Sequence, residues 1–122
     1  MGIEADLYSH LDDNLSCNIY ANKAPQGEKE FLLITKIYKD TEYSHDGNSG
    51  LCYADYQFDI YSARKDHAID IRQALEGEID GYTGNMGDTT LQGVFLTNEF
   101  DGYEEGANLH RETQEYTIQY QE

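Results

Sequence analysis

The chain has 122 residues, with 24 Asp and Glu against eight Lys and Arg and a formal charge of −16. A length of this order is typical of one domain, so we expect residues 1–122 to fold as a single unit. The charge argues against specific binding of nucleic acid and against anionic membrane surfaces, because both carry phosphate.

The targeting and redox signals point to the cytoplasm. No stretch of about twenty apolar residues predicts a membrane span, and the first residues do not resemble a signal peptide. We therefore expect Cys17 and Cys52 to be reduced thiols of a protein made in the cytoplasm.

The first half of the chain predicts one helix followed by strands. Apolar residues recur at every fourth position over residues 3–15, which predicts an amphipathic helix with acidic side chains, Asp6 among them, on its solvent side. A short extended segment at residues 19–21 and a turn around Pro25 come next. Residues 31–38 are apolar on both faces, which is typical of a strand inside a sheet.

A polar segment then leads to the clearest strand in the sequence. Residues 40–50 are rich in glycine and polar side chains and predict a flexible hairpin loop. Over residues 52–61 apolar and polar side chains alternate, which predicts a strand with one face in the core.

The second half repeats the order of helix and strands. Ala68, Ile71, Leu75 and Ile79 predict the inward stripe of a helix that is capped by Ser62 or Asp66 and ended by Gly81. Arg72 and Glu76 are among the side chains expected to stay in solvent.

A glycine-rich loop is expected over residues 81–87, a strand over 91–100, a turn or extended loop over 101–106, and a last strand over 116–120. The predicted class is α+β, with an antiparallel or mixed sheet of about four to five strands and two helices packed on one face.

Motifs that carry chemistry are missing from the sequence. There is no nucleophile elbow, no phosphate-binding glycine loop and no helical zinc motif, and the four histidines stand far apart. Residues 46–48 and 80–88 have the composition of calcium loops but not the EF-hand spacing. We expect no catalytic residue, no bound metal and no cofactor, and we do not expect an enzyme.

Tyrosine is the residue type in excess. The chain has eleven Tyr and no Trp, and several of them fall on the polar faces of the predicted strands. Such rings either flank the core or provide contact area for another protein. On the second interpretation, the candidate residues for subunit or partner contacts are Asp46, Asn48, Tyr53, Asp55, Asp59, Tyr61, Tyr103 and Glu104.

Four segments stand in a particular order along nearly the whole chain. They are residues 24–27 (Ala-Pro-Gln-Gly), 56–62 (Tyr-Gln-Phe-Asp-Ile-Tyr-Ser), 72–77 (Arg-Gln-Ala-Leu-Glu-Gly), and 110–111 (His-Arg) leading into 116–120. In order and spacing they resemble the tail-completion, tail-terminator or head-tail joining proteins of long-tailed bacteriophages. The sequence departs from that family at residues 30–32, Glu-Phe-Leu, where the family usually has Pro-Tyr.

The resemblance implies a structural virion protein of a phage or prophage, located in the tail or neck and assembled in the cytoplasm of the bacterial host. Such a protein forms a ring, commonly a hexamer, on the head-proximal end of the tail tube, and stops tube polymerisation. Its partners are further copies of itself, the major tail tube protein and a head-completion or stopper protein. DNA passes through the ring without being gripped, which the negative charge would suit.

Three alternatives stay open. One is another neck or tube component of related fold. Another is a small acidic binding protein, such as a DNA mimic that blocks a nucleic-acid-binding partner, as the charge of −16 suggests. The last is an enzyme, for instance a metal-dependent hydrolase.

Overall fold

The fold is a mixed sheet covered on one face by two helices. The computed structural model describes residues 2–44 and 47–121, and describes side chains outside residues 38–50. Its elements are α1 (Ile3–Asn14), β1 (Asn18–Ala21), β2 (Glu30–Ser44), β3 (Gly47–Ser62), α2 (Lys65–Ile79), β4 (Gly84–Met86), β5 (Thr89–Glu104) and β6 (Leu109–Gln121). In this described part the strands form one sheet in the order β1-β2-β3-β6-β5-β4.

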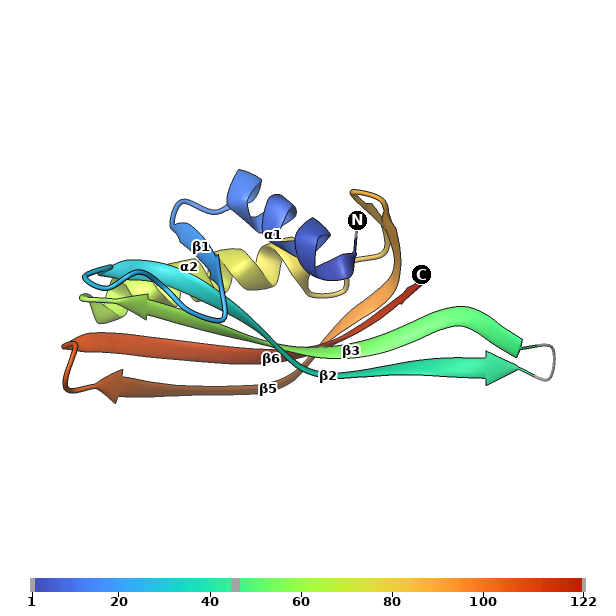
Figure 1. Cartoon of the computed structure of the whole chain (residues 1–122). Helices are drawn as coiled ribbons and strands as arrows, with labels where there is room; N and C mark the ends of the chain where they lie inside the picture. Colours follow the sequence, from blue (N-terminus) through green and yellow to red (C-terminus); the bar gives the residue numbers. More distant parts are fainter. Residues whose placement is uncertain (1, 45–46, 122) are drawn as a thin grey trace.

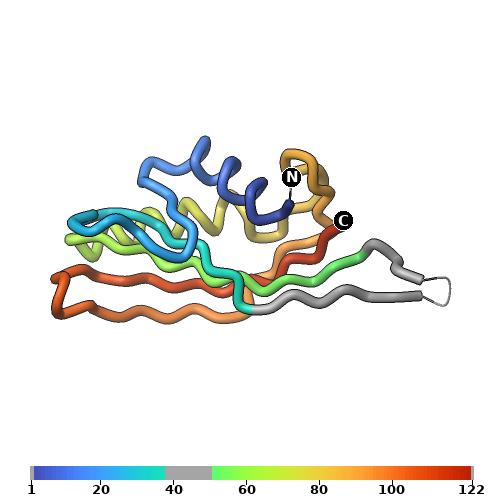
Figure 2. The backbone as a smooth tube through the Cα atoms, viewed as in Figure 1, coloured from blue at the N-terminus to red at the C-terminus, as the bar shows by residue number. Residues whose placement is uncertain are grey.

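Both helices lie against the same face of the sheet, so the opposite face carries no helix (Figures 1 and 2). We call this opposite side the helix-free face. The pair β1 and β2 is parallel and every other neighbouring pair is antiparallel. The predicted α+β class with two helices on one face is confirmed, but the described residues form six strands instead of four to five.

The additional strand, β4, lies inside the segment predicted to be a glycine-rich loop. It pairs with the start of β5 over only three residues, too few to show a periodic pattern. Gly84, its first residue, and Gly87, just after its end, have φ angles of 101° and 60°, a backbone conformation that glycine adopts without a steric penalty.

The strands are longer than predicted at two places. The backbones of β2 and β3 remain paired as far as Ser44 and Gly47, so most of the predicted loop at residues 40–50 is strand. Likewise β5 continues to Glu104, through much of the predicted turn at residues 101–106. In both places the backbone hydrogen-bonds to a neighbouring strand, which does not require an apolar side chain.

The apolar stripes of both helices meet the sheet as predicted. Leu7 and Leu11 of α1 and Leu75 of α2 are fully buried against it. On the sheet, the rings of Phe58 and Tyr116 pack edge to face at 5.7 Å, a favourable aromatic geometry. This cluster forms the core between the helices and the sheet.

Two predictions about helix polar groups are wrong. Asp6 does not face solvent: it is buried, and its carboxylate accepts a hydrogen bond from the Thr89 hydroxyl, which ties α1 to β5. The helix α2 begins after Arg64 without a side-chain cap. The Ser62 hydroxyl accepts from the Arg64 N–H at 3.2 Å, outside the first turn of the helix, and donates to Glu30 at 2.8 Å. The predicted end at Gly81 is confirmed, with a φ of 73°.

The remaining sequence expectations concern thiols and membranes. No disulfide joins Cys17 and Cys52, and both side chains are buried. Burial raises the pKa of the Cys17 thiol to about 11. Neither described helix has the length and apolar character needed to cross a bilayer.

Candidate interaction surface

The strand β3 divides its side chains between the two faces of the sheet, as its alternation predicted. Cys52, Ala54, Tyr56, Phe58 and Ile60 are buried on the helix side. The alternate side chains of β3 lie on the helix-free face and include four predicted contact residues, Tyr53, Asp55, Asp59 and Tyr61. Asp46 lies outside the described residues, and so does the side chain of Asn48.

The two aspartates on this face are held by β6. Asp55 Oδ1 accepts a hydrogen bond from the Thr117 hydroxyl at 2.6 Å, and Asp59 Oδ1 accepts one from the Thr113 hydroxyl at the same distance. Gln57 Nε2 donates to the second oxygen of Asp59 at 2.8 Å. Because Asp59 is buried, these donors offset part of the cost of removing its charge from water. Asp59 therefore joins two strands and is not presented to solvent.

An aromatic stack and an arginine cover one end of the same face. The rings of Phe31 and Tyr61 stack with centroids 4.8 Å apart, and burial raises the pKa of Tyr61. Arg111 lies across Gly102, where a Cβ atom would come within 2.6 Å of Nη2, and ion-pairs with Glu104 at 2.5 Å. This end of the face is therefore packed and charge-neutralised.

Tyr103 is separated from the other predicted residues. It follows Asp101 by two positions on β5 and therefore lies on the helix side, where its ring packs edge to face against His110 at 4.9 Å. Its hydroxyl donates to Asn108 Oδ1 at 3.3 Å. The structure thus brings five of the predicted residues to the helix-free face, namely Tyr53, Asp55, Asp59, Tyr61 and Glu104.

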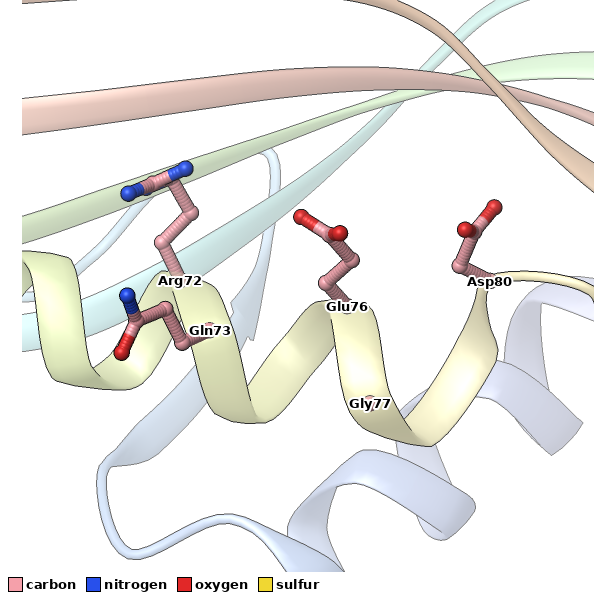
Figure 3. A pocket seen from close by; sticks show the side chains of 5 residues that line it. All are labelled: Arg72, Gln73, Glu76, Gly77 and Asp80. Atoms are coloured by element: carbon pink, nitrogen blue, oxygen red, sulfur yellow. The ribbon is translucent and has the colours of Figure 1, made fainter.

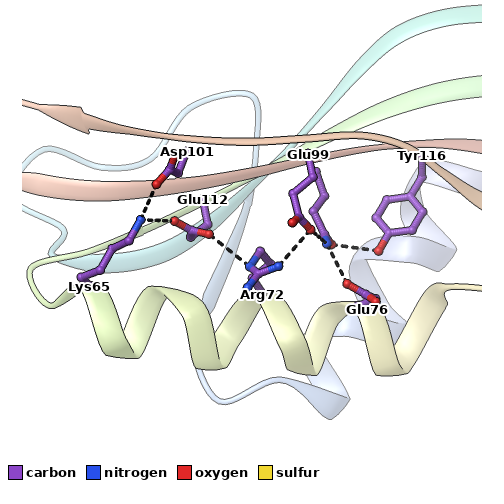
Figure 4. A network of polar contacts seen from close by, with 8 residues as sticks. Lys65, Arg72, Glu76, Glu99, Asp101, Glu112 and Tyr116 are labelled. Carbon is purple, nitrogen blue, oxygen red and sulfur yellow. Dashed lines mark hydrogen bonds and ion pairs between the residues drawn. The ribbon is translucent and has the colours of Figure 1, made fainter.

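On the helix side, α2 is joined to β5 and β6 by a polar network (Figure 4). Lys65 Nζ lies 2.7 Å from Asp101 and 2.5 Å from Glu112. Arg72 lies 2.9 Å from Glu99 and 3.1 Å from Glu112. Two cations of α2 therefore share the carboxylate of Glu112, whose side chain is only 7% exposed.

The network continues through an amide. Gln114 Nε2 donates to Glu99 at 2.6 Å and to Glu76 at 3.0 Å, and Gln114 Oε1 accepts from the Tyr116 hydroxyl at 2.8 Å. The hydrogen bond from Gln114, followed by the charge of Arg72, lowers the pKa of Glu99. Arg72 and Glu76 are half-buried, which corrects the expectation that both stay in solvent.

An open hollow of about 480 Å³ lies beside this network on α2 (Figure 3). Arg72, Glu76 and Asp80 line it and point toward the same side of the helix. The first two already contact Glu99 and Gln114, which reduces the capacity of the hollow to hold a ligand. Among the described residues no group of three or more His, Cys, Asp or Glu side chains is arranged to hold a metal.

Sequence reasoning missed that β5 exposes apolar side chains on both of its faces. Phe95, Leu96 and Phe100 are exposed and belong to the segment that was predicted only as a strand. The consecutive apolar residues at 95 and 96 could have indicated this exposure. Consecutive strand residues point to opposite faces of the sheet, and at an edge strand only one face is covered by the core.

The comparisons with known proteins give a structural match only. No family model matches the chain, and no curated protein matches it in sequence. A solved structure described as the virion of a native gene transfer agent (GTA) particle contains a chain of similar fold. The TM-score is 0.73, the match covers 98% of this chain and 95% of that chain, and 13% of the aligned residues are identical. The two chains therefore share a fold.

Proposed function

We propose that this chain is a structural protein of a phage-like virion that ends the head-proximal side of a tail tube as a ring. The ring stops tube polymerisation and forms the joint to the head. The observation that carries the proposal is the fold shared with a chain of a gene transfer agent virion over nearly the full length of both chains. The order of sequence segments that resembles tail-completion proteins supports the specific role at the tube end.

The proposed partners are protein surfaces. They are further copies of the chain, with a hexamer favoured, the major tail tube protein and a head-completion or stopper protein. The role is structural and not enzymatic, and it needs no cofactor. The protein is assembled in the host cytoplasm and remains in the tail or neck of the particle.

The charge is compatible with a conduit for DNA. A net charge of −16 on each copy repels the phosphate backbone, so DNA passing through such a ring is not retained.

On the helix-free face Asp55 and Asp59 accept hydrogen bonds from threonine hydroxyls and carry no ion pair with a described cation. We propose that this face, with Tyr53 and Tyr61, takes part in the contacts of the ring.

Deletion of the gene tests the role. Particles made without the protein are expected to have abnormally long tails, or tails that do not join heads, when viewed by negative-stain electron microscopy. A plasmid copy of the gene should restore normal joined particles. Joined virions with tails of normal length in the deletion strain would overturn the proposal.

The second candidate is a small acidic binding protein of the DNA-mimic type, which the charge of −16 favours. Pull-down from host extract with the tagged protein separates the two. Recovery of a basic nucleic-acid-binding enzyme supports the mimic, whereas recovery of tail tube protein supports the ring. Electron microscopy of the labelled protein in the particle distinguishes a tube cap from another neck component.

A further inference from the structure

The outer edge of β5 is uncovered along more than half of the strand. β5 pairs with β6 from Thr90 to Glu104 but with β4 only from Thr89 to Leu91. The Gly81 N–H then donates to the Val94 carbonyl at 2.8 Å. From Leu96 to Glu104 no strand of the described residues pairs with this edge (Figure 1). Within this stretch the Glu99 N–H donates to Asn98 Oδ1 at 3.0 Å, and the other backbone groups on the outer side have no strand partner in the described residues and are available to another strand.

Exposed apolar side chains gather on the same strand. Of the six large apolar side chains that are exposed in the described part of the chain, four belong to β5. Phe95, Leu96, Phe100 and Tyr103 are 53%, 36%, 41% and 49% exposed. The register with β6 and β3 puts Phe95 and Phe100 on the helix-free face, and Leu96 and Tyr103 on the helix side. A single exposed ring needs no explanation, but large apolar side chains exposed on both faces of one edge strand are typical of a contact surface.

The charges that would protect this edge are already neutralised. Natural edge strands commonly carry unpaired charges that prevent pairing with another chain. Here Glu99, Asp101 and Glu104 are ion-paired within the chain at 2.9, 2.7 and 2.5 Å, to Arg72, Lys65 and Arg111 respectively. The edge is left apolar and only weakly repulsive.

The same sheet offers a matching edge on its other side. β1 covers β2 only from Phe31 to Ile34. Beyond it Lys36 is exposed, and Ile37 is 51% exposed at an irregularity in the pairing of β2 with β3. This edge thus presents an apolar side chain and one of the few basic residues of an acidic chain.

We propose that the uncovered edge of β5 pairs with the edge of β2 beyond Ile34 in a second copy of the chain. The inference rests on the proposed ring and specifies its contact. Successive pairs β2–β3, β3–β6 and β6–β5 are all antiparallel, so β5 runs opposite to β2. A copy placed beside β5 in the same orientation therefore presents β2 for antiparallel pairing.

This contact joins two different edges and so repeats from copy to copy, as a ring requires. The register aligns Lys36, Tyr56, Tyr116 and Leu96 across the sheet. Toward one end of the strands from that row, β1 covers the outer edge of β2. Toward the other end, β4 covers the outer edge of β5. The two uncovered stretches therefore lie toward opposite ends of the sheet, and joined copies are staggered along the strands. Closed sheets need such a stagger.

Cross-linking between two single variants tests the pairing. Ile37→Cys and Phe100→Cys proteins are purified separately, mixed and treated with a short bis-maleimide, and products are separated on denaturing gels. A covalent dimer is expected in the mixture and not in either variant alone. The wild-type chain gives the background, which should be low because Cys17 and Cys52 are buried.

Three results would overturn the proposal. A dimer from Phe100→Cys alone would assign the contact to two β5 edges. No covalent product from the mixture at concentrations where the wild type sediments as an oligomer would remove the β5–β2 contact. A wild-type chain that sediments as a monomer at every concentration would remove self-pairing altogether.

A charge-insertion variant gives a second readout. Phe100→Lys is expected to abolish the oligomer, whereas Tyr8→Lys, an exposed ring of similar accessibility on α1, should leave it intact. Matching circular dichroism spectra and melting curves show that both variants fold, and equal oligomer content in the two would contradict the interface. If the deletion strain has defective tails but the cross-link is absent from particles, the proposed function stands and this contact fails. If the cross-link forms but the deletion strain makes normal particles, this contact stands and the proposed function fails.

Discussion

Replacing Arg72 by methionine tests whether the polar network on α2 stabilises the fold. Methionine keeps the apolar stem and removes the charge that lies 3.1 Å from Glu112 and 2.9 Å from Glu99. Breaking a fully buried ion pair costs about 3–5 kcal/mol, whereas an exposed pair contributes less than about 1 kcal/mol. Glu112 is almost fully buried, but in the variant it still has the ion pair with Lys65 at 2.5 Å, so its charge is not left without a partner. We therefore expect an intermediate loss of about 2 kcal/mol in the free energy of unfolding.

Urea unfolding followed by tyrosine fluorescence measures this loss, and at this chain length each kcal/mol lowers Tm by about 3–5 °C. Double-mutant cycles that combine Arg72→Met with Glu112→Gln or with Glu99→Gln measure the coupling free energy of each pair separately. The coupling of Arg72 to Glu112 should be the larger, because Glu112 is less exposed than Glu99. Arg64→Met, which removes an exposed pair at the start of α2, is the control and should leave stability unchanged within error. Equal losses for the two arginine variants, or a larger coupling to Glu99, would refute the reasoning.

Four further outcomes are expected. Gly87→Ala should lower the free energy of unfolding by more than about 1 kcal/mol in urea titrations, because φ there is 60° and a Cβ would collide with the Asp6 carboxylate. The pKa values of Glu99 and Asp101 are lowered in the folded chain, so both carboxylates stabilise the fold at pH values above their ordinary pKa of about 4. Melting temperatures recorded against pH should therefore fall as the pH drops through the lowered pKa values. Glu99→Gln should flatten that profile. The Cys17 thiol should resist a thiol reagent at pH 8 in the folded protein and react after denaturation, since burial raises its pKa to about 11. The oligomer measured by sedimentation should increase between about 0.01 M and 0.15 M salt, because screening weakens the repulsion between copies of charge −16.

Local periodicity predicted the elements whose spacing is set by burial. Leu7 and Leu11 recur at helical spacing and Ala54 and Phe58 at strand spacing because each set packs into the same core. Those patterns are visible within a window of about ten residues, so α1, α2 and the central part of β3 could be predicted from the sequence.

What could not be predicted depends on partners far away in the chain. Thr113 and Asp59 are 54 residues apart, and Thr117 and Asp55 are 62 apart, so no local pattern marks them as hydrogen-bonding pairs. No local pattern distinguishes Asp6 from the many surface acids, because its hydrogen-bond partner Thr89 is 83 residues later in the chain. The face to which Tyr103 belongs also depends on how far β5 extends.

The position of the charges reconciles a strongly acidic chain with one that associates with itself. Near the free edge of β5 the carboxylates of Glu99, Asp101 and Glu104 each have a cation partner. The local field at the sheet edge is therefore weaker than the total of −16 suggests, because an ion pair is nearly neutral beyond a Debye length. Repulsion between copies acts through more distant acids that salt screens, whereas edge pairing and apolar contact act at short range, where they decide whether two sheets join.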